Sequence, residues 1–220
     1  MRSSILLVAV LALTACPDPA KDKPKAEVAP APAAPKPAAP VAEAPKPPSL
    51  PGVQYRFSNA DSKLDWVGAK VTASHPGTFQ KFTGAIGLNE NDPTKSAVFV
   101  AIETASLTTA DSPKLVQHLK GPDFFDVEKF PFATFTSTAI KAGGEGGATH
   151  TVTGTLDLHG VQKSITFPAI IAASADAVTV KAEFAINRKD FNIVYPGMPD
   201  DLIRDEVLLK LDIAARPQGI

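Results

Sequence analysis

The feature that most limits the fold is an alternation of apolar and polar side chains that recurs along residues 53 to 217. It is cleanest over Ala177–Ile186, where apolar residues alternate with Thr179, Lys181 and Glu183. Because successive side chains of a strand point to opposite faces, this pattern predicts a strand with one buried face. The same period is present in Glu206–Ala214. Further strands are expected at Tyr55–Ser58, Leu64–Lys70, Phe79–Leu88, Ser96–Glu103, Phe132–Ile140, Thr149–Leu158 and Ser164–Ile171.

Turn-forming residues separate these segments, among them Asn89–Asp92 and the glycine cluster Gly143–Gly147. About eight antiparallel strands at this spacing predict an all-β domain built as a barrel or a sandwich. A barrel of about eight strands is wide enough to hold one small ligand where its side chains do not fill it. One short helix is expected over Ser112–Leu119, because Gly121 and Pro122 stop it.

An aromatic stretch, Leu119–Ser137, follows this helix. It holds five of the 12 phenylalanines, at positions 124, 125, 130, 132 and 135. Each such side chain is worth roughly 1.5–3 kcal/mol when fully buried, so leaving all of them in water is unfavourable. Two interpretations remain open at this point. The stretch either plugs one end of the barrel as part of the core or forms the rim of an apolar pocket.

The first fifteen residues are predicted to be a signal peptide and not part of the fold. Arg2 is positively charged, and Ile5–Leu13 is an apolar run too short to span a bilayer stably. The following Leu-Thr-Ala-Cys resembles a bacterial lipobox, which implies cleavage before Cys16 and lipid attachment to that residue. An ordinary secretory signal is the alternative. We therefore expect an exported lipoprotein of the cell envelope or periplasm, anchored in the inner or the outer membrane through Cys16.

The segment Pro17–Leu50 differs in composition from the rest of the chain. It contains 11 of the 21 prolines, many alanines and lysines, and no aromatic residue. Such a segment buries too little apolar surface to offset the entropy of ordering it, so we expect a disordered tether. The expected organisation is a signal peptide over residues 1–15, a lipidated cysteine with its tether over 16–52, and one barrel domain over 53–217.

Charge and cysteine content exclude several function classes. The net charge of −1 leaves no basic footprint for nucleic acid. A single cysteine excludes an intrachain disulfide and any CxxC redox or zinc site. The four histidines show neither HxH nor HExxH spacing, so no metal is expected, and His159 is expected to hydrogen-bond across a hairpin turn. No nucleophile elbow is present, and we expect no enzymatic activity.

The segment Leu119–Thr138, with Asp-Phe-Phe-Asp-Val-Glu-Lys-Phe-Pro, resembles the signature of the YceI-like family of lipocalin-like, polyisoprenoid-binding proteins. Further matching segments follow in family order between Val53 and Ala215: Asp92–Ser96, Ile102–Leu107, Val152–Leu156, Leu158–Val161, Ile186–Phe191 and Asp205–Val207. Two segments depart from the family pattern, Gly68–Phe82 and Ile171–Ala177, and both are expected to reshape the mouth of a tunnel.

The resemblance implies an extended eight-stranded antiparallel lipocalin-like barrel with one short helical lid and an apolar tunnel. It implies no cofactor; the expected partner is a long-chain isoprenoid-like ligand, an isoprenoid lipid or a quinone. The expected function is non-catalytic binding, sequestration or transport of such an amphiphile at the cell envelope. The alternative is a structural or interaction scaffold with a filled barrel core. The oligomeric state is left open.

The candidate ligand-binding residues are apolar side chains of the expected strands and lid, with one guanidinium: Trp66, Phe82, Val100, Phe124, Phe125, Phe132, Phe184 and Arg188. Trp66 and Phe184 are core aromatics by default, and the same side chains line a tunnel if one is open. Arg188 offers a guanidinium at the tunnel mouth for a phosphate or quinone oxygen. Its alternative role is a surface ion pair with Asp190 or another nearby carboxylate.

Overall fold

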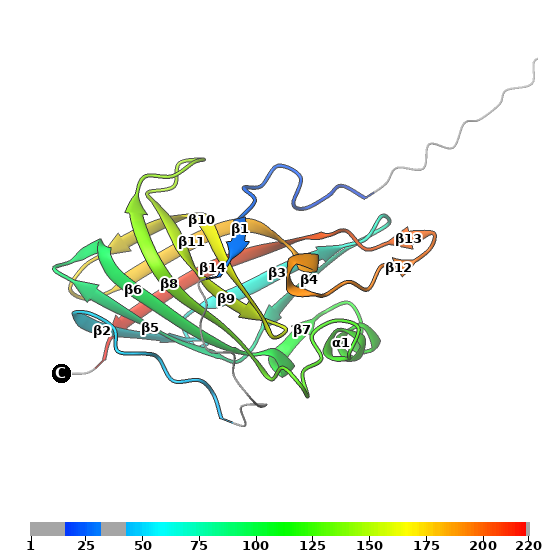
Figure 1. Ribbon diagram of the computed structural model, residues 1–220, viewed down its shortest axis with the longest axis horizontal. Coiled ribbons are helices and arrows are strands. Elements are labelled where there is room, and N and C mark those ends of the chain that lie inside the picture. Colours follow the sequence, from blue (N-terminus) through cyan, green and yellow to red (C-terminus); the bar gives the residue numbers. More distant parts are fainter. Residues whose placement is uncertain (1–15, 32–42, 219–220) are drawn as a thin grey trace, which may run out of the picture.

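The computed structural model describes residues 16–31 and 43–218, and its centre is a closed antiparallel barrel (Figure 1). The eight strands of the ring are β2 (Val53–Ser58), β5 (Phe82–Asn89), β6 (Asp92–Glu103), β8 (Phe132–Ala142), β9 (His150–Leu158), β10 (Val161–Ala173), β11 (Val178–Asn187) and β14 (Glu206–Pro217). Around the ring they run β10–β9–β8–β6–β5–β2–β14–β11 and return to β10. The prediction of an all-β, eight-stranded barrel with one short helix is confirmed.

The wall of the barrel is extended at one end by three further strands. Strand β14 pairs with β2 through Arg216 and Pro217, and with β3 (Lys63–Ala69) through residues 208–212. Strand β3 pairs in turn with β4 (Ser74–Phe79), and β4 with β7 (Leu107–Thr109). The strand expected at Phe79–Leu88 is therefore two strands, β4 and β5, divided at residues 80 and 81.

This extended end also carries the irregular elements of the fold. They are the 3-10 turns η1 (Thr104–Ser106) and η2 (Arg188–Phe191), the helix α1 (Pro113–Lys120), and the hairpin of β12 (Gly197–Met198) and β13 (Asp201–Leu202). Figure 1 shows α1 and the β12–β13 hairpin together at the right of the molecule. We call this the open end of the barrel.

The helix α1 begins and ends where the sequence predicts. The Ser112 hydroxyl accepts a hydrogen bond from the Lys114 N–H (3.2 Å), Pro113 occupies the first turn, and the helix stops before Gly121. No residue of α1 is fully buried, so the helix lies on the barrel as a lightly packed lid. Within the described residues, no helix is long and apolar enough to cross a membrane.

The N-terminal segment contradicts the expectation of a disordered tether. The predicted signal peptide, residues 1–15, lies outside the described residues, but Cys16 to Ala31 are described and contact the barrel. Strand β1 (Glu27–Pro30) pairs antiparallel with residues 163–166 of β10. Ala20 is only 1% exposed, and Ala26 and Val28 pack against the core. The expectation that this part of the chain makes few native contacts is wrong.

The reason for this order lies in a gap between β10 and β11. These two strands pair only over residues 170–173 and 178–181, and beyond that point they separate. The Ala185 N–H of β11 donates to the Pro24 carbonyl, and the Ala185 carbonyl accepts from the Ala26 N–H, each at 2.8 Å. Unpaired backbone groups in a barrel wall are costly, so a neighbouring strand gains stability by pairing with them. Composition alone does not reveal such a vacant edge.

The residues just before the barrel also touch it. A Cβ at Gly87 would come within 2.3 Å of the Pro51 carbonyl oxygen and 2.7 Å of the Leu50 Cβ, so this stretch crosses the outer face of β5 directly over that glycine. The Leu50 carbonyl also accepts a hydrogen bond from the Gln54 side chain (3.1 Å). The tether expectation is therefore wrong here as well, whereas residues 32–42 lie outside the described part.

The end opposite the helix is closed by packed side chains. The rings of Phe167 and Phe184 stack with centroids 4.1 Å apart. Tyr55 is 1% exposed, and its hydroxyl lies 3.0 Å from the carbonyls of both Ser174 and Ala175. The hydrophobic core therefore fills this half of the barrel, and the other half is available for a cavity.

Candidate ligand-binding site

A cavity of about 720 Å³ occupies the open half of the barrel. This volume falls within the roughly 300–1,000 Å³ of small-molecule sites. Its wall is mainly apolar and comes from the ring, the extension and the lid: Leu64, Trp66, Phe79, Ile102, Leu115, Leu119, Phe124, Phe125, Ala133, Leu156, Leu158, Ile186, Ile193, Ile203, Val207, Leu209 and Leu211. An apolar chain therefore finds a matching surface inside the barrel.

Strand β14 shows directly that the interior is not filled. Its inward side chains Val207, Leu209 and Leu211 line the cavity and keep accessible surface, although they belong to the apolar face that the sequence predicts to be buried. Leu208 points outward and is only 2% exposed. It pairs with Ala185, the residue to which the N-terminal segment is bonded. An unfilled interior contradicts the alternative of a barrel whose core is closed by side chains.

The aromatic stretch after α1 forms the rim of this cavity. The Phe124 ring is 7% exposed, and its centroid lies 5.5 Å from that of Tyr195. The Phe125 ring meets Phe79 edge to face at 5.8 Å. Both Phe124 and Phe125 line the cavity beneath the lid. Of the two interpretations of this stretch, the structure supports the rim of an apolar pocket.

Polar groups gather where the cavity opens. Nδ1 of His75 lies 2.7 Å from Oδ2 of Asp111, and Nε2 of His118 lies 3.0 Å from Oδ2 of Asp123. The His118 ring also packs edge to face on Phe124 and Tyr195, with centroids 5.0 and 5.1 Å away. His75, Asp111 and His118 line the cavity. The site therefore combines an apolar interior with a polar mouth.

These mouth residues were not among the predicted site residues. His75 and Asp111 lie 36 positions apart, and no local motif announces their contact. For His75 the available signal was the departure at Gly68–Phe82, which forms the end of β3, the turn after it and β4. The other segment that departs from the family pattern, Ile171–Ala177, does not reach the mouth. The carbonyls of its Ser174 and Ala175 accept hydrogen bonds from the Tyr55 hydroxyl at the closed end.

A sequence model described as "YceI-like domain" matches residues 55–215 of this chain. The chain belongs to the YceI-like family. Relatives include a UPF0312 protein of Pseudomonas putida, 37% identical over 127 residues, and Protein YceI of Salmonella arizonae, 37% identical over 123 residues. These alignments cover 55% and 53% of this chain and 65% and 62% of the relatives, so somewhat less than two thirds of each relative is matched.

Solved structures of the YceI-like fold agree with the barrel. Burkholderia cenocepacia BcnA is 26% identical with a TM-score of 0.61, and the match covers 71% of this chain and 97% of BcnA. A polyisoprenoid binding domain from Saccharophagus degradans, implicated in plant cell wall breakdown, has a TM-score of 0.59 at 18% identity. That match covers 75% of this chain and 98% of the domain, and at this identity it speaks for the fold alone.

The YceI-like barrel brings four of the predicted ligand-binding residues to the cavity: Trp66, Phe124, Phe125 and Arg188. Trp66 lies flat over Gly77 of the neighbouring strand, where a Cβ would come within 2.1 Å of the indole. Glycine at this position therefore lets the ring lie against the wall and leaves the interior free.

The other four predicted residues lie elsewhere. Phe82 and Phe184 are 3% and 2% exposed in the packed core and do not line the cavity. Val100 packs against the core as well. Phe132 is outside the core cluster, because the buried Ala133 directly after it occupies the inward position of β8. For Phe82, Val100 and Phe184 alternation identified the inward face but not whether the side chain is packed, and Phe132 was assigned to the wrong face.

Arg188 has a structural role that the sequence did not predict. Its side chain is 4% exposed and donates to the carbonyls of Arg204 (3.1 Å), Ile193 (2.7 Å) and Ile203 (3.4 Å). Nη2 of Arg188 forms an ion pair with Oδ1 of Asp205 at 3.4 Å, and of these two side chains only that of Arg188 is buried. Burial lowers the pKa of the guanidinium, and Asp205 raises it. Because its donors are already engaged, the expectation of a free guanidinium is wrong. The expected ion pair is made with another carboxylate, Asp205, and not with Asp190, and its Arg188 side is buried and not at the surface.

His159 also differs from its expected role. Nδ1 lies 3.2 Å from the Phe191 carbonyl oxygen in η2, so the contact joins two distant segments and does not cross the hairpin turn. Burial is the main cause that lowers the pKa of His159. His159 does not line the cavity, and residues 16–31 and 43–218 contain no group of three His, Cys, Asp or Glu side chains suited to a metal ion.

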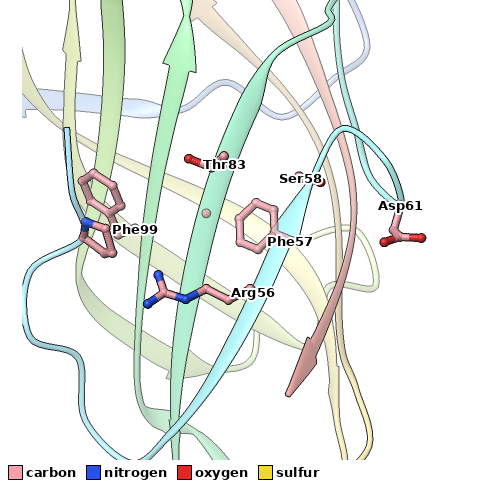
Figure 2. A pocket seen from close by; sticks show the side chains of 8 residues that line it. Arg56, Phe57, Ser58, Asp61, Thr83 and Phe99 are labelled. Carbon is pink, nitrogen blue, oxygen red and sulfur yellow. The ribbon is translucent and has the colours of Figure 1, made fainter. Parts of the chain in front are cut away.

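A second hollow, of about 380 Å³, lies against β2 and β5 (Figure 2). Figure 2 shows Arg56, Phe57 and Thr83 on these neighbouring strands, with Phe99 beyond them. The Phe57 ring fills the space above Gly84, where a Cβ would come within 2.0 Å of it. This hollow is smaller and mixes polar with apolar groups, so the barrel cavity is the better site for a long apolar ligand.

Proposed function

We propose that this YceI-like protein binds, sequesters or carries a long-chain amphiphile, isoprenoid-like or similar, in the cavity of its barrel. The observation that carries the proposal is the open apolar cavity of about 720 Å³ beneath α1 and the aromatic rim. The chain of the ligand lies against Leu156, Leu209 and Leu211, and its polar end stays among the side chains of the mouth. The role is binding and not catalysis.

The isoprenoid class is the first to test because a structural neighbour is described as a polyisoprenoid binding domain. Apolar burial supplies the affinity: each buried CH₂ contributes about 0.8 kcal/mol, so a chain of several prenyl units outweighs the cost of immobilising it. Since Arg188 is engaged by backbone carbonyls, a phosphate or quinone oxygen is better placed near His75 and His118.

We further propose that the protein works at the cell envelope, anchored in a membrane through a lipid on Cys16. The sequence Leu-Thr-Ala-Cys supports this assignment. Stable attachment takes two signals, such as two acyl chains. Labelled fatty acid should therefore enter the protein and be lost from a Cys16→Ser variant, whereas equal incorporation into both would contradict the lipobox assignment.

The binding proposal is tested by gentle purification of the protein from its own membrane, solvent extraction and mass spectrometry. A long-chain lipid should be present in about one copy per protein. In a Leu211→Trp variant the added ring fills the cavity and should reduce the lipid content. The matched control is Lys210→Trp, which adds the same ring at the exposed neighbouring position of β14.

The proposal predicts that only the inward substitution lowers lipid content. Circular dichroism would establish that both variants remain folded. An absence of long-chain lipid in the parent protein, together with failure of prenyl or acyl probes to bind the emptied protein, would rule out the carrier function.

A further inference from the structure

The open end of the barrel carries most of the exposed large apolar side chains of the described chain. There are six such residues, and four of them lie here: Val71, Val194, Met198 and Leu202, between 41% and 62% exposed. Val71 and Leu202 are joined by a backbone hydrogen bond, and Val194 lies between the cavity-lining Ile193 and Tyr195. We call these four residues the apolar rim. Met198 lines the cavity, and each of the other three is next in the chain to a residue that lines it.

The other two exposed residues, Val53 and Ile170, lie toward the closed end. Val53 pairs with Leu88 at the end of β5 farthest from the cavity, and Ile170 pairs with Lys181 in the short β10–β11 contact. The concentration of exposed apolar surface at the mouth is therefore a local feature. Single exposed apolar residues are ordinary, but a group around a cavity mouth is typical of an interaction surface.

The N-terminal segment begins at this same end. The Cys16 N–H donates to the Val71 carbonyl (3.2 Å), and the Cys16 carbonyl accepts from Nη2 of Arg204 (3.2 Å). Nη1 of Arg204 also donates to Asp18 at 3.3 Å. In Figure 1 the first blue residues lie beside the β3–β4 turn and the β12–β13 hairpin.

The segment holds this position through bonds along its length. Between Cys16 and β1 it contributes the buried Ala20 and the two hydrogen bonds to Ala185. A lipid on Cys16 would therefore be attached directly beside the mouth, with no slack chain between the anchor and the barrel. This differs from a long tether, which would leave the orientation of the barrel unspecified.

We propose that the apolar rim is a membrane-docking surface, on which the open end of the barrel rests against the phospholipid bilayer that holds Cys16. The cavity mouth then faces lipid, and an apolar chain passes between bilayer and cavity without crossing water. The inference rests on the proposed anchoring and lipid binding.

The charged side chains next to the apolar rim in the chain favour a bilayer contact driven by apolar burial. Lys70 is paired with Asp201, and Arg204 with Asp18, so both cations are already neutralised. Asp200 at the hairpin turn adds a negative charge. Attraction to anionic lipid is therefore weak, and docking should depend little on salt, unlike binding through a basic patch.

The test uses the chain from Cys16 onward, which contains every residue that the structure describes. Cys16 is the only cysteine, so its thiol can be coupled to a maleimide phospholipid in phosphatidylcholine vesicles. The acyl chains are brominated near the headgroup, because docked apolar faces enter about 5–10 Å. The variant Leu202→Trp reports on the rim, and Ile170→Trp is its control at a similarly exposed position (50% and 51%).

The parent protein, whose only tryptophan is the buried Trp66, gives the baseline. In Leu202→Trp, the brominated lipid should quench most of the fluorescence of the introduced tryptophan at both low and high salt. In Ile170→Trp, that fluorescence should remain. Equal quenching of the two, or none at Leu202→Trp, would overturn the docking surface. So would a vesicle-free dimer that a Leu202→Glu variant abolishes, because the rim would then join two copies.

Chemical coupling separates this inference from the function on which it rests. If cells do not acylate Cys16, or if no lipid occupies the cavity, the quenching experiment still decides whether the rim contacts a bilayer. If the rim docks, Met198→Glu with Leu202→Glu should slow uptake of a prenyl probe from vesicles about tenfold or more, the equivalent of about 1.4 kcal/mol. Ile170→Glu should leave uptake unchanged, and equal uptake in both would show that docking does not serve transfer.

Discussion

Deletion of residues 17–30 from the chain that begins at Cys16 should destabilise the barrel, because this segment closes the gap between β10 and β11. The deletion removes the two 2.8 Å hydrogen bonds to Ala185 and the pairing of β1 with residues 163–166. It also uncovers Ala185, which is 0% exposed, and the part of the core that Val28 covers.

The expected loss can be estimated from these contacts. Each backbone hydrogen bond contributes a net 0.5–1.5 kcal/mol, and partial burial of Val28 adds about 1 kcal/mol. The ion pairs Lys23–Glu183 and Lys25–Glu206 involve exposed groups, so they add little. Ordering the segment opposes these terms. A net loss of about 3 kcal/mol would lower Tm by about 6–12 °C in a domain of this size.

Thermal unfolding followed by circular dichroism measures this loss. Two point variants in the undeleted chain from Cys16 onward isolate the strand itself: Val28→Asp places a carboxylate against the core, and Ala29→Asp places the same group on the exposed face of β1. Val28→Asp should lower Tm by several degrees, and Ala29→Asp should change stability by no more than about 0.5 kcal/mol. A deletion variant with the Tm of the parent would refute the reasoning.

Three further predictions concern residues whose roles the structure reassigns. Arg188→Met should lower the free energy of unfolding by about 3 kcal/mol in urea titrations, because it leaves three carbonyls and Asp205 without their donor, whereas the lipid content of folded protein should stay unchanged. Phe184→Trp should overpack the stack with Phe167 and cost about 1–3 kcal/mol, again with no loss of lipid. Burial lowers the pKa of His159 in the folded protein. As the pH falls through about 6.5, His159 therefore becomes protonated in the unfolded chain before it does so in the folded protein, and the free energy of unfolding decreases. Asparagine tolerates the left-handed backbone at this position (φ +54°), so the variant to test is His159→Asn. Between urea titrations at pH 7.5 and pH 5.5, this variant should lose less unfolding free energy than the parent protein. An identical pH dependence in the two proteins would contradict the assignment.

The sequence by itself determined the sidedness of the strands and the position of the helix. The alternation over Ala177–Ile186 places Ala182 and Phe184 inward and Lys181 outward, because the side-chain period of a strand is two. Ser112 and Pro113 begin α1 and Gly121 ends it, because capping depends on residues adjacent in the chain. The aromatic stretch after the helix was compatible with a core plug or with a pocket rim, and the sequence did not choose between them.

Only the tertiary structure decided which inward side chains meet the cavity and which are packed. Phe184 and Leu211 both point inward from neighbouring strands, but Phe184 stacks on Phe167 whereas Leu211 faces the cavity, although Phe184 pairs directly with the cavity-lining Leu209. Whether an inward side chain is packed or left open depends on the side chain that meets it from elsewhere in the barrel, which for Phe184 is Phe167 of β10. The order of Cys16–Pro30 has the same origin: its composition favours disorder, and it becomes ordered because β10 and β11 separate and leave backbone groups that need a partner.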